Sequence, residues 1–196
     1  MLKKRIAMAL GLAAALFGVA LQGRAIDESG VDVLPDRSFV HYESKTGLKV
    51  PLGWNIITPY RLRKKAMSTV MGVEKDNPMQ AITIVWSPIG NRPFSDFIRA
   101  AADEQLGEEY ALLQTVYGKA KVGRPTTINV GPYQVFKILI EDGPDRDGRF
   151  AGALYLFEAG TGENRWRVKI RAVYPAMNRE KYIKEVEDVI NTFTKE

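Results

Sequence analysis

Apolar and polar residues alternate along most of the chain beyond residue 38, and a period of two is typical of strands that bury one face. Turn-forming Gly, Pro, Asp and Asn separate the alternating runs. The strand-like runs are 38–43, 48–50, 55–58, 66–75, 81–87, 126–130, 133–141, 150–158 and 165–174. Because the connections between the last runs are too short for crossover helices, we predict an antiparallel sheet.

Two segments show a helical period in place of the alternation. The first is 95–108, where Ser95 is suited to be the N-cap and the apolar residues lie opposite a row of acids. The second is 178–193, whose apolar residues fall on one side of a helix: Tyr182, Val186, Val189, Ile190 and Phe193. Strands interrupted by one helix and closed by another are typical of an α+β domain, here an antiparallel β-sheet flanked by helices.

The stretch 46–54 joins two strand-like runs at a sharp corner. Pro51 lacks the amide donor for a ladder hydrogen bond, and Gly53 permits a tight bend. The large side chain of Trp54 follows at once. We therefore predict that the corner turns Trp54 into the core as an anchor.

Residues 1–25 have the three parts of a secretory signal peptide. A positive start at 3–5 precedes an uninterrupted apolar run at 6–21, and Gly23 and Ala25 place small residues around a cleavage site. The apolar run is shorter than the roughly 20 residues of a membrane-spanning helix. We predict cleavage near Ala25, with an uncleaved membrane anchor as the alternative.

After the predicted signal peptide, the sequence divides into a predicted linker and a predicted domain. Residues 26–38 are short of large apolar groups and contain Gly30 and Pro35, so we predict a flexible linker there. Residues 39–196 are predicted to form a single α+β domain, with no internal repeat and no low-complexity tract.

Charge and cysteine content narrow the class of protein. The formal net charge is +5, but residues 1–25 hold four of the 28 basic residues and no acid, which leaves 24 basic residues against 23 acidic ones. This near balance removes the electrostatic argument for nucleic-acid binding. The chain has no cysteine, which excludes disulfides and a lipid anchor on Cys. A bacterial periplasmic or secreted protein with no stable membrane span after cleavage fits these features.

The order of the predicted elements resembles the PsbP-like family. The resemblance is carried by Gly47, the Pro51-x-Gly53-Trp54 corner, a hairpin, a Ser-capped helix, a meander and a terminal amphipathic helix that ends at Phe193. The family includes an extrinsic photosystem subunit, bacterial relatives and the Ran-binding Mog proteins. The resemblance implies an α/β/α sandwich and a non-catalytic role as an accessory subunit. Many bacterial members are lipoproteins, whereas this chain lacks the cysteine.

His41 is the only histidine in the chain. A transition-metal site normally needs several His or Cys ligands, and none accompany it. No nucleophile elbow, zinc-protease motif or phosphate-binding Gly-rich loop is present in the sequence. A histidine packed or solvated within a strand is therefore the favoured interpretation, and we predict no catalytic residues, no metal ligands and no cofactor.

The acidic turn from Asp142 to Asp147 resembles part of a calcium-binding loop. Gly143 stands where the first ligand belongs, and Leu154 stands where a bidentate Glu is expected. A solvated hairpin turn is favoured over a calcium site, since Asp and Gly are common in turns.

The last strand-like run has the sharpest pattern in the chain. Its period-2 geometry places four cations on one face, opposite a core stripe that begins at Trp166. The cations are Arg165, Arg167, Lys169 and Arg171. Their mutual repulsion needs neutralisation, by Glu158 and Glu141 on neighbouring strands or by an anionic partner. The first possibility is a solvated face with cross-strand ion pairs, and the second makes this basic row the candidate binding site.

These observations favour an exported, non-catalytic binding or accessory protein whose partner is another protein or an anionic surface. Two alternatives are an extrinsic photosystem II subunit and an enzyme with a carboxylate and Arg site. The binding hypothesis predicts that reversing Arg167 and Lys169 to Glu abolishes partner capture and leaves the melting temperature almost unchanged.

Overall fold

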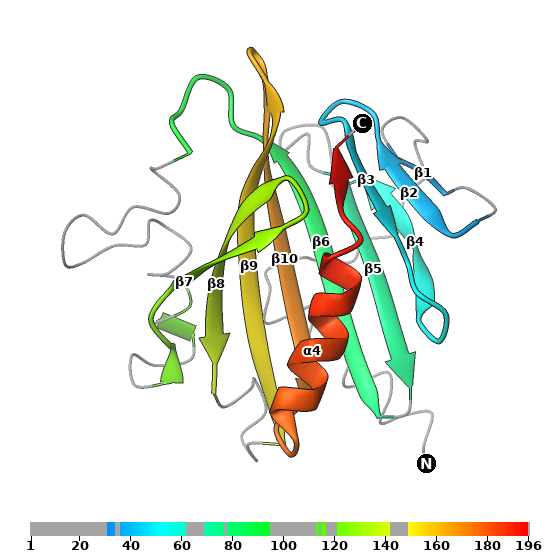
Figure 1. Cartoon of the computed structure of the whole chain (residues 1–196), viewed down its shortest axis with the longest axis vertical. Helices are drawn as coiled ribbons and strands as arrows, with labels where there is room; N and C mark the ends of the chain where they lie inside the picture. Colours follow the sequence, from blue (N-terminus) through cyan, green and yellow to red (C-terminus); the bar gives the residue numbers. More distant parts are fainter. Residues whose placement is uncertain are drawn as a thin grey trace.

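Two antiparallel sheets and one helix build the part of the protein that the computed structural model describes (Figure 1). The described residues are 31–33, 36–61, 69–76, 78–94, 113, 115–116, 121–141 and 149–195. The larger sheet has seven strands in the order β4-β5-β6-β10-β9-β8-β7, and the smaller has four in the order β1-β2-β3-β11.

The element boundaries follow the alternating runs of the sequence closely. The large sheet consists of β4 (Asn55–Arg61), β5 (Thr69–Asp76), β6 (Met79–Pro88), β7 (Thr126–Val130), β8 (Tyr133–Ile140), β9 (Phe150–Thr161) and β10 (Asn164–Pro175). The small sheet consists of β1 (Val31–Val33), β2 (Ser38–His41), β3 (Thr46–Lys49) and β11 (Thr194–Lys195). The helix α4 covers Arg179–Ile190. The expected antiparallel pairing is present at every strand pair described.

Strand β10 is the centre of the large sheet and separates its two faces. It pairs with β9 from Asn164 to Pro175 and with β6 from Trp166 to Val173. The hairpin from β9 to β10 needs Gly160, because a Cβ atom there would lie 1.9 Å from the carbonyl oxygen of Asn164. Paired on both edges, β10 buries every second side chain.

The front face of the large sheet, defined by Trp166, Val168 and Ile170 of β10, carries α4 and the small sheet (Figure 1). Helix α4 buries Val186, Val189 and Ile190 against it. The small sheet contributes apolar side chains to the same cluster, which also holds aromatic residues from both sheets, from the corner before β4 and from the segment after α4. These aromatic residues and their small-sheet neighbours are Phe39, Leu48, Trp54, Trp86, Tyr155, Phe157, Tyr174 and Phe193.

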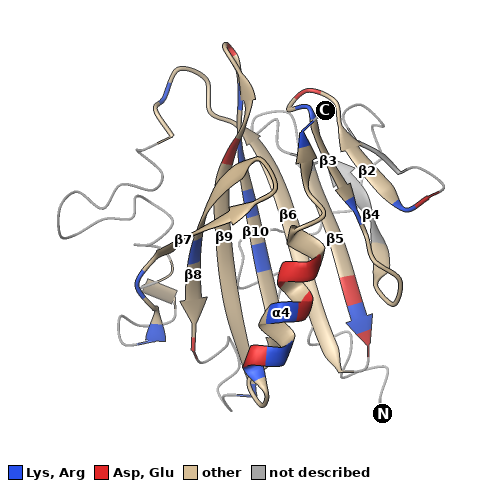
Figure 2. Ribbon diagram, viewed as in Figure 1, with Lys and Arg blue, Asp and Glu red and all other residues tan. Residues whose placement is uncertain are grey.

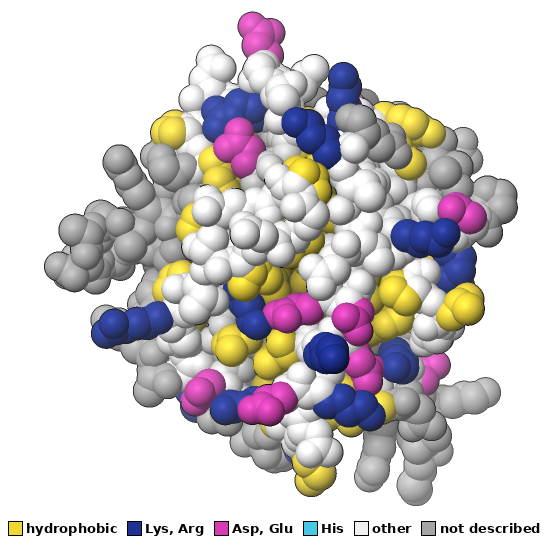
Figure 3. Space-filling view, in the orientation of Figure 1, with side chains coloured by type: hydrophobic (Ala, Val, Ile, Leu, Met, Phe, Trp, Pro, Cys, Tyr) yellow, Lys and Arg dark blue, Asp and Glu magenta, His cyan; other side chains and the backbone are white. Residues whose placement is uncertain are grey.

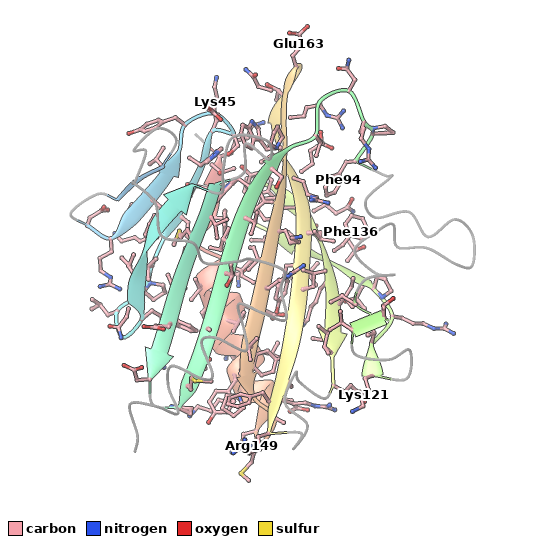
Figure 4. The ribbon with its side chains drawn as sticks, turned by 180° about the vertical axis from the view of Figure 1, so that it is seen from behind. Lys45, Phe94, Lys121, Phe136, Arg149 and Glu163 are labelled. Atoms are coloured by element: carbon pink, nitrogen blue, oxygen red, sulfur yellow. The ribbon has the colours of Figure 1, made fainter. Side chains whose placement is uncertain are left out.

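The rear face of the large sheet has a second, smaller apolar cluster. Its buried members are Leu113, Val122, Ile138, Ile140, Leu154 and Leu156. Phe94 and Phe136 pack at its margin and lie near one another when the molecule is seen from behind (Figure 4). Strand β9 is consequently buried on both faces along residues 151–157.

Arg37 fixes the predicted corner at residues 50–54. Its guanidinium donates to the carbonyl oxygens of Val50 (3.1 Å), Pro51 (3.3 Å) and Trp54, while the amide of Val50 donates to the carbonyl oxygen of Arg37 (3.0 Å). Gly53 has φ of 88°, which explains the glycine at the bend. Trp54 is buried in the core as predicted. One side chain therefore satisfies three carbonyls that the break in strand pairing leaves without ladder partners.

Three expectations differ from the structure. The predicted flexible linker, 26–38, contains β1, Arg37 and the first residue of β2, and a strand of three residues is too short to show a period of two in the sequence. The hairpin 38–50 joins β1 and β11 in a sheet of its own, since the corner at Pro51 ends its pairing with the rest of the chain. The α/β/α sandwich is not matched in the described part, where α4 is the one helix with full bounds and shares its face with the small sheet.

Several predictions lie outside the described residues. These are the signal peptide at 1–25, the helix at 95–108 and the acidic turn from Asp142 to Asp147. Within the described ranges, no helix combines the length and the apolar character that a membrane span requires.

Replacing Arg37 with Ala is expected to lower the free energy of unfolding by about 2 kcal/mol, because it removes charge-assisted hydrogen bonds and leaves carbonyls of the corner unsatisfied. Urea denaturation of the two proteins measures the difference. The matched control is Lys49→Ala, which removes an exposed ion pair to Asp36 (3.4 Å) beside the same corner and should have a much smaller effect. Equal effects of the two substitutions would contradict the role given to Arg37.

Candidate functional site

The predicted basic row belongs to β10, in the middle of the large sheet (Figure 2). Its residues alternate with Trp166, Val168 and Ile170 of the front face, so their side chains lie on the rear face. In register, Arg167 is opposite Glu158 of β9 and Ser87 of β6, whereas Lys169 is opposite Leu156 and Val85. Arg171 is flanked by Leu154 and Thr83. The row is therefore bordered on both sides by strands that present few charges.

Arg165 is neutralised within the sheet. Its Nε lies 2.5 Å from Oε1 of Glu158, its second terminal nitrogen lies 3.0 Å from Oε2, and its other donates to the carbonyl oxygen of Arg92 (3.1 Å). The hydrogen bond to Glu158 raises the pKa of Arg165. Of the two acids expected to balance the row, Glu158 does so, whereas Glu141 lies 3.7 Å from Arg179 at the start of α4.

The other three cations of the row are half-buried. The Nε atoms of Arg167 and Arg171 are shielded from solvent. Arg167, Lys169 and Arg171 each have an interaction partner within the molecule. All four cations thus contribute to the folded structure, and any binding role of the basic row comes in addition to that structural role.

His41 is a packed histidine at the junction of the two sheets. Its ring stacks on Trp86 of β6, with centroids 5.2 Å apart and planes at 4°, and meets Trp166 of β10 edge-on at 4.7 Å. Its Nδ1 lies 2.7 Å from the Ser44 hydroxyl and accepts a hydrogen bond from the Ser44 amide (3.1 Å). Burial lowers the pKa of His41 to about 4, so the imidazole is neutral at neutral pH.

Two carboxylates of α4 bind the sheet beneath the helix. Oε2 of Glu185 accepts hydrogen bonds from Lys75 (2.9 Å) and Gln80 (2.8 Å). Burial tends to raise the pKa of Glu185, but the hydrogen bonds from Gln80 and Lys75 and the charges of Lys75 and Lys181 together lower it. On the other side of the helix, Oε1 of Glu187 accepts hydrogen bonds from Nζ of Lys137 (2.5 Å) and from the hydroxyl of Tyr155 (3.3 Å). The pKa of Tyr155 is raised by burial and by the nearby Glu187 charge.

Sequence reasoning missed these contacts of α4. A signal was present in β8, where Lys137 interrupts the apolar run from Val135 to Ile140, since such a lysine usually has a partner when its neighbours are buried. Figure 3 shows acidic and basic side chains intermingled around α4 on the front of the molecule. This surface has no single sign of charge, and the contacts serve to seat the helix.

The described residues contain no group of three or more His, Asp or Glu side chains placed to hold a metal ion. The acidic turn considered as a calcium site lies outside them. Among the described residues, His41 is the one ionisable side chain outside the tyrosines that is fully buried, and solvent does not reach it.

Comparison with known proteins identifies the architecture. The chain is similar in structure to cyanobacterial PsbP (CyanoP) from Synechocystis sp. PCC 6803, whose solution structure it matches with a TM-score of 0.50 at 10% sequence identity. The alignment covers 90% of this chain and 99% of that chain. No family model and no curated protein matches the sequence.

The protein has a PsbP-like fold. The resemblance found in the sequence is thus confirmed at the level of the fold. At 10% identity, few side chains are shared, so the likeness concerns the path of the chain and assigns no site residues to this protein.

The double variant Arg167→Glu and Lys169→Glu is expected to lower the melting temperature by several degrees, because it places a carboxylate directly opposite Glu158 and reverses charge at half-buried positions. Differential scanning calorimetry measures the shift. Lys195→Glu, at an exposed position of β11, is the control and should melt as the wild type does. A double variant that melts with the wild type would restore the expectation of a purely solvated row.

Proposed function

We propose that this protein is a non-catalytic accessory protein that binds a protein partner through the corner at Pro51, Leu52 and Gly53. The observation that carries the proposal is the side chain of Leu52, which is 88% exposed at the tip of the corner. An exposed leucine alone is ordinary on a protein surface. Leu52 differs from an ordinary exposed leucine because the backbone that carries it is held in place by the rest of the protein.

Contacts with the rest of the protein hold the backbone of the corner in place. Arg37 donates to the carbonyl oxygens on both sides of Leu52, and Trp54 packs into the core directly after the bend. A partner therefore meets an apolar group whose backbone is already ordered, and little conformational entropy is lost on binding. Preorganised loops on a rigid scaffold commonly serve as binding elements.

The surroundings of Leu52 suit a protein interface. Asp36 and Lys49 form an exposed ion pair on one side of the corner, and Asn55 donates to Asp76 (3.4 Å) on the other. An apolar centre with a polar rim is the usual anatomy of a protein–protein contact. The same arrangement offers no convergent carboxylates and no nucleophile, which is why a binding role is preferred to an enzymatic one.

The wider setting of the proposal comes from the sequence and the fold. The predicted signal peptide supports export to the periplasm or the exterior. The PsbP-like fold supports an accessory role, and CyanoP is the named cyanobacterial protein of this fold. An extrinsic photosynthetic subunit is a special case of the same proposal, with an assembly of the photosynthetic membrane as the partner.

A photo-crosslinking amino acid at position 52 tests the proposal. It is introduced in the full chain, which is expressed in the source organism and irradiated in intact cells. We expect one crosslinked protein species, because a rigid corner meets one partner in one orientation. The matched control carries the crosslinker at position 177, since Met177 is 79% exposed but lies in the turn before α4.

A second comparison separates the corner from the basic row. Leu52→Glu should abolish capture of the crosslinked species while leaving the melting temperature unchanged, and Met177→Ser should alter neither. The proposal fails when positions 52 and 177 crosslink to the same proteins, or when position 52 yields no adduct. Capture that survives Leu52→Glu but is lost on changing the basic row would transfer the binding role to β10.

A further inference from the structure

We propose that His41 is an acid-sensitive latch: the neutral imidazole holds the small sheet on the front face of the large sheet, and its protonation releases the small sheet locally. This inference concerns a conformational change and does not depend on the corner being a binding element.

The position of His41 is the first argument. It belongs to β2 of the small sheet, yet both of its ring contacts, Trp86 and Trp166, come from the large sheet. Only 1% of the residue is exposed. Any change in this ring therefore acts directly on the contact between the two sheets.

The hydrogen bonds around the ring specify its neutral form. The indole Nε1 of Trp86 donates to Oγ1 of Thr46 (2.9 Å), and Oγ1 lies 2.8 Å from the hydroxyl of Ser44. The Ser44 hydroxyl lies between Oγ1 of Thr46 and Nδ1 of His41 (2.7 Å), so it can accept from Thr46 and donate to Nδ1. The Ser44 amide also donates to Nδ1. Nδ1 is thus an acceptor, and the proton of the neutral ring resides on Nε2.

Protonation conflicts with this network at both nitrogens. A proton on Nδ1 would require the Ser44 hydroxyl to turn and accept it, and it would still lie beside the Ser44 amide, donor against donor, at a nitrogen separation of 3.1 Å. Nε2 is buried and has no hydrogen-bond partner among the described residues, so the second N–H of the imidazolium gains nothing there. The lowered pKa of His41, about 4, agrees with this geometry and arises mainly from burial.

In the described part of the chain, no charged group compensates the imidazolium. Strand β6 contains no ionisable side chain, and the cations of β10 that flank Trp166, namely Arg165 and Arg167, belong to the opposite face. In the turn after β2, Glu43 and Lys45 are exposed, as are Lys49 of β3 and Lys195 of β11. On β1, the register places Val31 rather than Asp32 opposite His41.

We expect the small sheet, and not the large one, to open when His41 is protonated. Its strands are two to four residues long, and β11 joins β3 through only two residue pairs. The large sheet, by contrast, pairs β10 with β9 over twelve residues. Regions with few backbone pairings open at a lower free energy than the core of the fold. Acid should therefore loosen β2 and β3 before the large sheet.

The direction of the pH dependence follows from proton linkage. Between about 6.5, the ordinary pKa of histidine, and about 4, an opened His41 binds a proton and a docked one does not. Docking is therefore strongest above pH 6.5 and weakens as the pH falls. Over this window the preference for the docked state decreases by up to about 300-fold, the ratio of the two proton affinities.

Because His41 is the only histidine, its imidazole can be followed by NMR in the full chain without assignment. The test is a titration from pH 7.5 to 4 combined with hydrogen exchange, corrected for the intrinsic rate at each pH. We expect the amides of Phe39 and Leu48 to lose protection as the imidazole titrates. The amides of Val168 and Ile170 should remain protected over the same range.

His41→Phe and His41→Asn provide matched controls. The first keeps an aromatic ring against Trp86 without a titrating group, and the second keeps an acceptor near the position of Nδ1. Protection of β2 and β3 should be independent of pH in both. The latch is refuted by an imidazole that titrates near 6.5 with the small sheet still protected, by loss of protection in both sheets together, or by opening of β2 and β3 while the imidazole stays neutral. The wild-type titration alone decides the question when the variants do not fold.

Discussion

The pairing of β10 on both of its edges is the constraint on which the rest of the structure depends. A strand paired over its whole length cannot rotate its side chains between faces, so its alternation assigns each residue to one side of the sheet. Trp166 and the other apolar side chains of β10 then lie on the front face, where α4 and the small sheet bury them. The cations of the same strand must point to the rear, and Arg165 finds Glu158 there.

The alternating pattern made most of the large sheet predictable. β6 shows why: buried and half-buried residues follow each other without a break, and the sequence has the same period. The terminal helix was equally readable, because Val186, Val189 and Ile190 share one side. The pattern also indicated the corner, since Pro51 and Gly53 act through backbone geometry alone and do not depend on distant residues.

The division into two sheets could not be read from the sequence, and the reason is physical. β1 and β11 are so short that three or two residues carry their signal, and their pairing depends on backbone hydrogen bonds across distant parts of the chain. Arg37 shows the same limit. It has φ of 70°, an unusual value for an arginine, and its three carbonyl partners lie 13 to 17 positions away.

The candidate site was predictable in part for a related reason. The alternating pattern predicted that the four cations lie on one face of one strand. It cannot distinguish a solvated face from one that other groups pack against, because both have polar residues at alternate positions. Arg167 and Arg171 are half-buried on this face, and their neighbours on β6 and β9 come from distant parts of the sequence. The His41 network was out of reach for the same reason, since Trp86 is remote in sequence from His41.

Fold similarity at 10% identity separates two kinds of position in this chain. Core positions need only an apolar residue of suitable size in the right period, so they can diverge almost completely while the path of the chain persists. Chemistry shared with other proteins of the fold would require particular side chains in particular places, and so low an identity makes that a poor starting assumption. The informative positions are those that the fold does not require. Leu52 is one, because its exposed apolar side chain adds nothing to the core, whereas burying His41 with an unpartnered nitrogen costs stability that an apolar residue would not. The function of this protein should be sought at residues such as these, whose replacement by another residue would leave the fold equally stable or more stable.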